Sequence, residues 1–259
     1  MNSMELIMSR KSIRTFDGRP LTDSDKEKLR AFIATISNPY GIPVKYVLLD
    51  AEEHGLSSPV IQGEHLYIAG KVQKVEHCEE AFGYSFEQLV LYAWSQGIGT
   101  TWIGGTMKRE LFEAAAQVKE GELMPIVSPL GYPAKEKSEV DAKLRNSVHG
   151  DDRLPAIELF FDGDFSRPLQ EMDPLLEAVR WAPTAANMQP CRIVKCGTKY
   201  HLYEKHMKGY KPGAPWDVQR IDMGIALCHL LCVTGGSCEI ADPGIPCPEG
   251  TEYIVTVTV

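Results

Sequence analysis

A helix–turn–strand pattern occurs twice in this sequence, at residues 29–48 and again at residues 176–195. In each copy, apolar residues at helical spacing are followed by a turn and then by a short run of branched apolar residues. The copies align without a gap, and these pairs are identical: Leu29 and Leu176, Ala31 and Ala178, Pro43 and Pro190, Val47 and Val194. The sequence therefore predicts an internal duplication in which two similar halves support one another.

The two copies differ in the turn. Residues 183–190 of the second copy read PTAANMQP, in which Thr184, Asn187 and Gln189 supply hydrogen-bond donors and acceptors. The positions aligned with Pro183, Asn187 and Gln189 hold Ile36, Tyr40 and Ile42 in the first copy. The connection therefore does not require the polar set of the second copy, which favours a ligand-binding role over a purely structural Asx-type turn.

Composition limits the classes of partner. The chain of 259 residues has a formal net charge of −8, which disfavours a broad nucleic-acid-binding surface and favours small partners. No apolar run approaches the roughly 18 residues of a membrane span, and charged residues interrupt the N-terminal segment where a signal peptide would be apolar. Seven scattered cysteines are typical of a reduced cytoplasmic protein. Cys228 and Cys232 flank His229, but we interpret them as core residues and predict no metal site.

The hydrophobic pattern predicts an α+β fold. The expected helices are 26–36, 83–94, 108–118 and 224–234, and the expected strands are 44–49, 100–103, 124–130 and 252–259. The helices at 83–94 and 224–234 are apolar on nearly all faces, which indicates a central position. Gly97 suits a left-handed cap after the first of them. Residues 135–152 are highly charged and weakly patterned, which indicates a solvated connector.

Two further segments are candidates for ligand binding. Residues 10–14 (RKSIR) place three cations and a hydroxyl together, a set that suits phosphate oxygens, although a solvated charged run has the same composition. Gly104 and Gly105 either let the backbone approach a flat ligand or simply end a strand. These glycines follow a helix and lack the Rossmann spacing, so we reject a dinucleotide-binding fold. No serine elbow or histidine spacing indicates hydrolysis, so chemistry would come from a bound cofactor.

Taken together, these segments resemble the FMN-dependent nitroreductase family, particularly its fused branch, in which one chain mimics the usual homodimer. The resemblance covers nearly the whole chain and rests on these motifs: RKSIR at 10–14, GIGTTWIGG at 97–105, GYP at 131–133, RLP at 153–155 and APTAANMQP at 182–190. It implies a nitroreductase-like α+β fold with two pseudo-symmetric halves, residues 1–165 and a shortened half at 166–259. Such a chain would function as a pseudo-dimeric monomer, and further association is compatible with it.

The resemblance also implies a cofactor site in three parts. Four residues look like a clamp for the FMN phosphate: Arg10, Lys11, Ser12 and Arg153. Arg14 corresponds to the basic residue that approaches the pyrimidine edge of the flavin. Four residues match the segment that runs along the isoalloxazine ring: Trp102, Ile103, Gly104 and Gly105. Five turn residues would reach the ring and ribityl chain from the other half: Pro183, Thr184, Ala185, Asn187 and Gln189.

Each half would then supply a different part of one flavin site. The second half has no clamp, because residues 157–161 (IELFF) are acidic and apolar, and the first half has Tyr40 in place of the turn asparagine. The chain also departs from the family pattern, since Asp151 stands where many members have a lysine. Arg145 and Lys143 are possible substitutes for that cation.

The function implied by the resemblance is an FMN-dependent NAD(P)H oxidoreductase. NADH or NADPH would be the transient donor in a ping-pong reaction with a small acceptor such as a nitroaromatic or a quinone, and no side chain need act as a catalytic acid or base. The alternative is a non-catalytic flavin-binding or storage protein. A third possibility is another reductive chemistry, such as dehalogenation, controlled by a lid at residues 199–219 with Tyr203, Tyr210 and Trp216.

Overall fold

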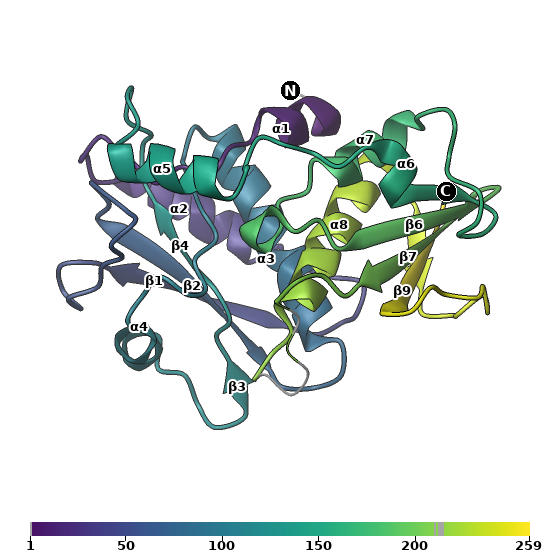
Figure 1. Ribbon diagram of the computed structural model, residues 1–259. Coiled ribbons are helices and arrows are strands. Elements are labelled where there is room, and N and C mark those ends of the chain that lie inside the picture. The colour runs from purple at the N-terminus through teal and green to yellow at the C-terminus, as the bar shows by residue number, and fades with distance from the viewer. Residues whose placement is uncertain (1, 210, 212–214) are drawn as a thin grey trace.

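The computed structural model describes residues 2–209, 211 and 215–259, which form two sheets on either side of a central pair of helices (Figure 1). The α-helices are α1 (Ser3–Ser9), α2 (Asp23–Ile33), α3 (Cys78–Ser95), α4 (Arg109–Ala115), α5 (Glu139–Ser147), α6 (Ala156–Leu159), α7 (Pro174–Arg180) and α8 (Val218–Thr234). The strands are β1 (Val44–Asp50), β2 (Leu66–Gln73), β3 (Glu122–Leu123), β4 (Val127–Leu130), β5 (Phe160–Asp162), β6 (Cys191–Cys196), β7 (Lys199–Lys205), β8 (Ser237–Glu239) and β9 (Thr251–Thr258).

The first sheet is antiparallel and is built around β2. Strand β1 pairs along one edge of β2, and β3 and β4 share its other edge. The second sheet has the order β5-β6-β7-β9-β8, in which β5 and β6 are parallel and the other pairs are antiparallel. Strand β5 precedes residue 165, where the sequence suggests the boundary between halves, but lies in the second sheet. The chain therefore crosses from one sheet to the other ahead of that position.

Local sequence signals place several elements where we predicted them. The hydroxyl of Thr22 accepts a hydrogen bond from the Asp25 amide at 3.2 Å and caps α2. Gly97 (φ 74°) follows α3 and Gly235 (φ 62°) ends α8, both in the left-handed conformation that glycine adopts without strain. The strands predicted at 44–49 and 252–259 are confirmed as β1 and β9.

The central helices α3 and α8 cross at two glycines. A Cβ on Gly83 would lie 2.0 Å from the carbonyl oxygen of Ile221, and one on Gly224 would lie 2.1 Å from that of Glu80. Each carbonyl belongs to the residue three positions before the other glycine, so the crossing is pseudo-two-fold symmetric. The predicted central position is confirmed, because buried residues of both helices join a core that includes both sheets. The described helices are all too short or too polar to cross a membrane.

The strand predicted at residues 100–103 is wrong. Thr100 pairs with Ser12 in a parallel bridge, whereas Ile103 pairs with Val127 in an antiparallel bridge. Because the segment changes partner within four residues, no continuous ladder forms. Its irregular path places it between the RKSIR segment and β4.

The solvated connector predicted at residues 135–152 is also wrong, because this segment contains α5. The Ser138 hydroxyl caps the helix by accepting from the Asp141 amide at 3.2 Å. Asp141 is 2% exposed and pairs with Arg14 at 3.2 Å. The buried contact of α5 is therefore a charge pair, which the search for an apolar stripe could not detect.

Candidate functional site

A cavity of about 830 Å³ is lined by residues from both halves. Its volume lies within the range of roughly 300–1,000 Å³ that is usual for small-molecule sites. Thirteen of the fourteen residues that the sequence suggested for a cofactor site line it: Arg10, Lys11, Ser12, Arg14, Trp102, Ile103, Gly104, Gly105, Arg153, Pro183, Thr184, Ala185 and Asn187. Segments that are remote in sequence thus meet around one space.

The exception is Gln189, which does not line the cavity. Its side-chain oxygen accepts the Leu154 amide hydrogen at 2.9 Å. Asn187 reaches the cavity, but its side-chain NH₂ donates to the carbonyls of His149 and Asp152 at 2.7 and 3.1 Å. Both side chains therefore hold the turn against the loop between α5 and α6.

The turn has an unusual backbone. Three of its non-glycine residues have positive φ: Ala186 (49°), Asn187 (56°) and Gln189 (52°). Such conformations cost about 1–2 kcal/mol per residue and persist where the surroundings hold them. The Thr184 hydroxyl accepts the Gln189 amide at 2.9 Å, and Asp222 accepts the Ala185 amide at 3.0 Å. These contacts keep the strained turn in place at the cavity wall.

Asp222 is a site residue that the sequence reasoning missed. It lies in α8, lines the cavity and is 3% exposed. Burial raises its pKa well above the ordinary value, and the Ala185 amide only partly offsets this effect. A sequence signal did exist, since Asp222 is the one acidic or basic residue other than histidine within the apolar run 221–231.

Replacing Asp222 with asparagine tests its protonation. A raised pKa in the folded protein gives stability that is full below the unfolded pKa and is lost as the pH rises through the folded pKa. Asparagine does not titrate and still accepts the Ala185 amide. We therefore expect the free energy of unfolding of Asp222→Asn, relative to wild type, to increase from about pH 5 to about pH 8. Urea unfolding of the two proteins measures this difference, and Asp23→Asn, at a 96% exposed side chain, is the control. A difference that is independent of pH would contradict the raised pKa.

Arginine side chains gather at the cavity. Arg10 and Arg153 line it, and each has a buried Nε without a hydrogen-bond partner among the described residues. Burial lowers the pKa of both groups, and repulsion between them and from Arg145 adds to the effect. Arg10 has a distant acidic neighbour, since its Nε lies 4.0 Å from Glu87. A buried guanidinium nitrogen without a hydrogen-bond partner is costly, so this cluster is suited to an anion with several acceptor oxygens.

Of the two possible substitute cations, Arg145 lines the cavity and Lys143 does not. Arg145 Nε donates to Asp151 Oδ2 at 2.7 Å, and its Nη2 bonds the other oxygen of the same carboxylate. This pair raises the pKa of Arg145 and lowers that of Asp151. Lys143 is 81% exposed and lies 3.5 Å from Glu139. Asp151 therefore neutralises part of the positive charge at the cavity.

Aromatic residues form other parts of the lining, in a set of three tryptophans: Trp102, Trp181 and Trp216. Trp102 donates its indole N–H to Glu87 at 3.2 Å. The guanidinium of Arg153 lies 4.8 Å above the ring of Trp181. The cavity thus combines a cationic cluster with flat apolar surfaces.

Glu87 connects the aromatic lining to the second half. His229 of α8 places Nε2 3.0 Å from Glu87 and Nδ1 2.8 Å from the carbonyl of Ala178. The imidazole thus bridges α3 of the first half and the end of α7 in the second half. His229 and Cys228 are fully buried, as core residues would be, whereas Cys232 is exposed, so its interpretation as a core residue is wrong.

The three aromatic residues of the suggested lid have different positions. Tyr203 is fully buried in β7, so it is part of the core. Trp216 lines the cavity and stacks against Arg109, whose guanidinium lies 4.5 Å from the ring centre. Tyr210 lies outside the described residues. Of the two lid aromatics that the structure describes, Trp216 is therefore the one that can contact a ligand in the cavity.

Comparisons with known proteins place the chain in a family. No curated protein matches the sequence. A solved structure of "a putative nitroreductase" from Thermotoga maritima MSB8 matches with a TM-score of 0.64 and 20% identity, covering 100% of this chain and 94% of that one. A nitroreductase family protein from Clostridium novyi NT matches at 18% identity and a TM-score of 0.46, over 55% of this chain and 91% of its own. An "FMN-dependent Nitroreductase" from Clostridium difficile R20291 matches at 15% identity and a TM-score of 0.44, over 51% of this chain and 88% of its own.

The family model described as "Putative TM nitroreductase" matches residues 2–233. This match includes both sides of the cavity and both central helices. The full-length structural match gives the same fold for the whole chain. The chain therefore belongs to this nitroreductase family and has the nitroreductase fold, with two pseudo-symmetric halves in one polypeptide.

Proposed function

We propose that the cavity binds FMN and that the protein is an FMN-dependent oxidoreductase, passing electrons from NADH or NADPH to a small acceptor such as a nitroaromatic or a quinone. The observation that carries this proposal is the cluster of arginines beside tryptophan-lined walls, which suits a ligand with an anionic group and a flat ring. Membership of a nitroreductase family supports oxidoreductase chemistry in general.

Different cavity residues would bind the phosphate and the ring of FMN. Arg10 and Arg153 would donate from their guanidinium groups to the phosphate, with Arg145 adding charge. The segment from Trp102 to Gly105 would lie along the ring, and a Cβ at Gly105 would meet nothing within 4 Å, so the backbone there leaves open space. When bound, FMN would supply two-electron transfer between donor and acceptor. The protein residues would hold it, and donor and acceptor would use the same face in turn.

Flavin uptake and reduction test the proposal. The purified protein, or apoprotein incubated with FMN, is expected to be yellow and to release FMN on denaturation. Anaerobic NADH or NADPH should bleach it, and an added quinone should sustain consumption of the donor. Tight flavin binding without turnover would favour the alternative of a non-catalytic flavin-binding or storage protein. A colourless protein that takes up no added FMN would contradict both.

We expect one FMN per chain. The position aligned with Asn187 is held by Tyr40, which packs against His77 with ring centres 5.5 Å apart and has a buried hydroxyl. The nearby Glu80 is paired with Arg220 at 2.9 Å. These contacts fill the region where a second pseudo-symmetric site would need space and free cations. Flavin absorbance against protein concentration measures the ratio, and two FMN per chain would mean that both sites persist.

Asp151 is expected to weaken FMN binding, because it neutralises Arg145 at the cavity. Asp151→Asn should lower the dissociation constant for FMN by about three- to tenfold, the effect of a modest gain in charge attraction. Fluorescence titration of the apoprotein with FMN measures it. Asp152→Asn serves as the control, because it makes the same change of net charge at the adjacent residue, which does not line the cavity. An unchanged or weaker affinity in Asp151→Asn would show that the carboxylate instead positions Arg145.

A further inference from the structure

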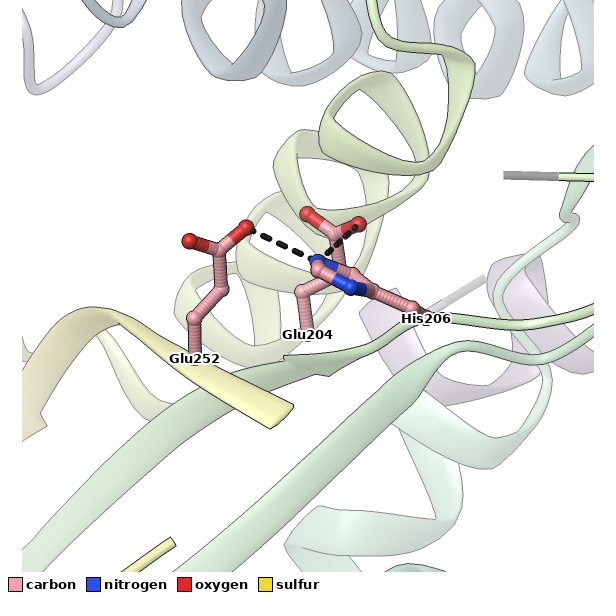
Figure 2. A group of neighbouring side chains, drawn as sticks. All are labelled: Glu204, His206 and Glu252. Carbon is pink, nitrogen blue, oxygen red and sulfur yellow. Dashed lines mark hydrogen bonds and ion pairs between the residues drawn. The ribbon is translucent and has the colours of Figure 1, made fainter. Parts of the chain in front are cut away.

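A second group of polar side chains lies away from the cavity, on the second sheet. Glu204 of β7 is directly opposite Glu252 of β9 in the register of the two strands. His206 follows Glu204 by two residues, and alternate residues of an extended chain share a face. Figure 2 shows the imidazole of His206 between the two carboxylates. The sheet thus brings together three potential metal ligands that are not adjacent in sequence.

The spacing of the ligand atoms suits a small cation. His206 Nε2 lies 3.1 Å from Glu252 Oε1 and 3.9 Å from Glu204 Oε1, and one atom from each of the three residues lies within 4.8 Å of the others. Tetrahedral Zn²⁺ with bonds of about 2.0–2.2 Å to nitrogen and oxygen places its ligands about 3.3–3.5 Å apart. Side-chain rotations that shorten the longer separations would form the site.

Glu204 provides independent support, because its buried carboxylate has no hydrogen-bond donor. The side chain is 0% exposed, and neither oxygen has a hydrogen-bond partner among the described residues. Arg220 Nε lies 3.0 Å from Oε2, so that oxygen is paired by charge. Oε1 is directed toward His206 (Figure 2). A buried carboxylate oxygen without a donor is costly, and coordination of a cation would satisfy it.

The charges of the cluster leave an acidic excess. Arg220 lies 2.9 Å from Glu80, 3.0 Å from Glu204 and 2.8 Å from Glu252. Three carboxylates thus share one guanidinium, and a divalent cation would balance the excess of acidic groups. Arg220 would then be an outer partner that fixes the orientation of the ligating carboxylates.

We propose that Glu204, His206 and Glu252 bind one divalent cation of the Zn²⁺ type, with solvent completing its coordination. A nitrogen and two carboxylate ligands suit Zn²⁺ better than Mg²⁺ or Ca²⁺, which prefer oxygen ligands alone. The cation would tie β7 to β9 next to the N-terminal turn of α8. This proposal departs from the expectation from sequence that the chain binds no metal, since the three ligands come together only when the strands pair.

Zinc titration of the full-length protein tests the proposal independently of flavin. After treatment with a chelator and its removal, calorimetry with ZnCl₂ is expected to give about one high-affinity Zn²⁺ per chain and a rise in Tm with excess Zn²⁺. His206→Ala should weaken binding by about 100-fold or more, given that loss of an outer-shell partner alone costs about 10–100-fold. Glu252→Gln, at a 40% exposed side chain, provides a second variant in case the first is unstable. His54→Ala, an exposed histidine outside the cluster, should bind as wild type does.

The seven cysteines are an alternative source of metal binding, and Co²⁺ separates the two. Co²⁺ bound by nitrogen and oxygen gives visible bands without a thiolate charge-transfer band, which is the expected result. Thiolate coordination, wild-type affinity in both His206→Ala and Glu252→Gln, or no binding at all would overturn the proposal. In each of those cases Arg220 would be the cation around which the cluster is built.

Discussion

Replacing Gly224 with alanine is expected to destabilise the protein by about 3 kcal/mol or more, because the new Cβ would lie 2.1 Å from a backbone oxygen of α3. In an unconstrained helix the same change stabilises by about 1 kcal/mol, so the expected sign is the reverse of the helix propensity. Gly83→Ala should have a similar effect, since its Cβ would meet the carbonyl of Ile221 at 2.0 Å. Neither carbonyl can move unless the two helices separate.

Thermal unfolding of the apoprotein measures this effect, and a loss of about 3 kcal/mol corresponds to a fall in Tm of about 6–12 °C. Gly105→Ala is the matched control, because it adds the same methyl group where nothing lies within 4 Å. It should leave the Tm of the apoprotein nearly unchanged. If Gly83→Ala or Gly224→Ala is as stable as wild type, the close crossing of α3 and α8 is not the constraint described above.

Arg153→Gln is expected to weaken FMN binding by about 10- to 100-fold, because a hydrogen bond to a charged group contributes about 1.5–3 kcal/mol. The stability of the apoprotein should change little. Relief from burying the unpartnered Nε opposes the loss of the stacking of Arg153 on Trp181 and of its hydrogen bonds to the carbonyls of Gly150 and Asp152. A large loss of affinity with little loss of apoprotein stability is typical of a residue kept for a ligand.

Riboflavin separates a phosphate contact from a general effect, since it carries the same ring without the phosphate. The dissociation constant for riboflavin should be nearly the same in Arg153→Gln and wild type, whereas that for FMN should rise. Arg180→Gln is the control for charge, because Arg180 is near Arg153 but does not line the cavity. If Arg153→Gln weakens the binding of FMN and of riboflavin equally, Arg153 contacts the ring or supports the cavity wall. That result would contradict its role in the phosphate clamp.

The elements with a strong periodic signal could be read from the sequence. Both central helices have apolar residues on nearly every face, and β1 and β9 are rich in branched residues, so local pattern and final structure agree. Helix α5 lacks such a signal because its buried residue is a carboxylate, Asp141, whose partner Arg14 comes from a distant segment. The strand predicted at 100–103 failed for a related reason, since its partners on the N-terminal segment and β4 do not form one ladder.

The candidate site was largely visible in the sequence as separate motifs, but their roles depend on packing. Gln189 looked like a ligand contact and instead accepts the Leu154 amide. Asp222 looked like one polar residue in an apolar helix, and only the position of the turn shows that it holds the Ala185 amide at the cavity wall. A donor or acceptor can be recognised by residue type, whereas its partner is set by contacts between remote segments.

The sequence by itself determined the α+β class, the two long apolar helices, the repeated helix–turn–strand unit and the cationic and polar motifs, because periodicity and residue chemistry are local properties. The tertiary structure alone decided that α3 and α8 cross at Gly83 and Gly224, that β5 joins the second sheet, and that the arginines meet the turn around one cavity. It also decided that Glu204, His206 and Glu252 meet on one face. These outcomes depend on contacts between segments that are remote in sequence, and such contacts form only when the two halves pack together.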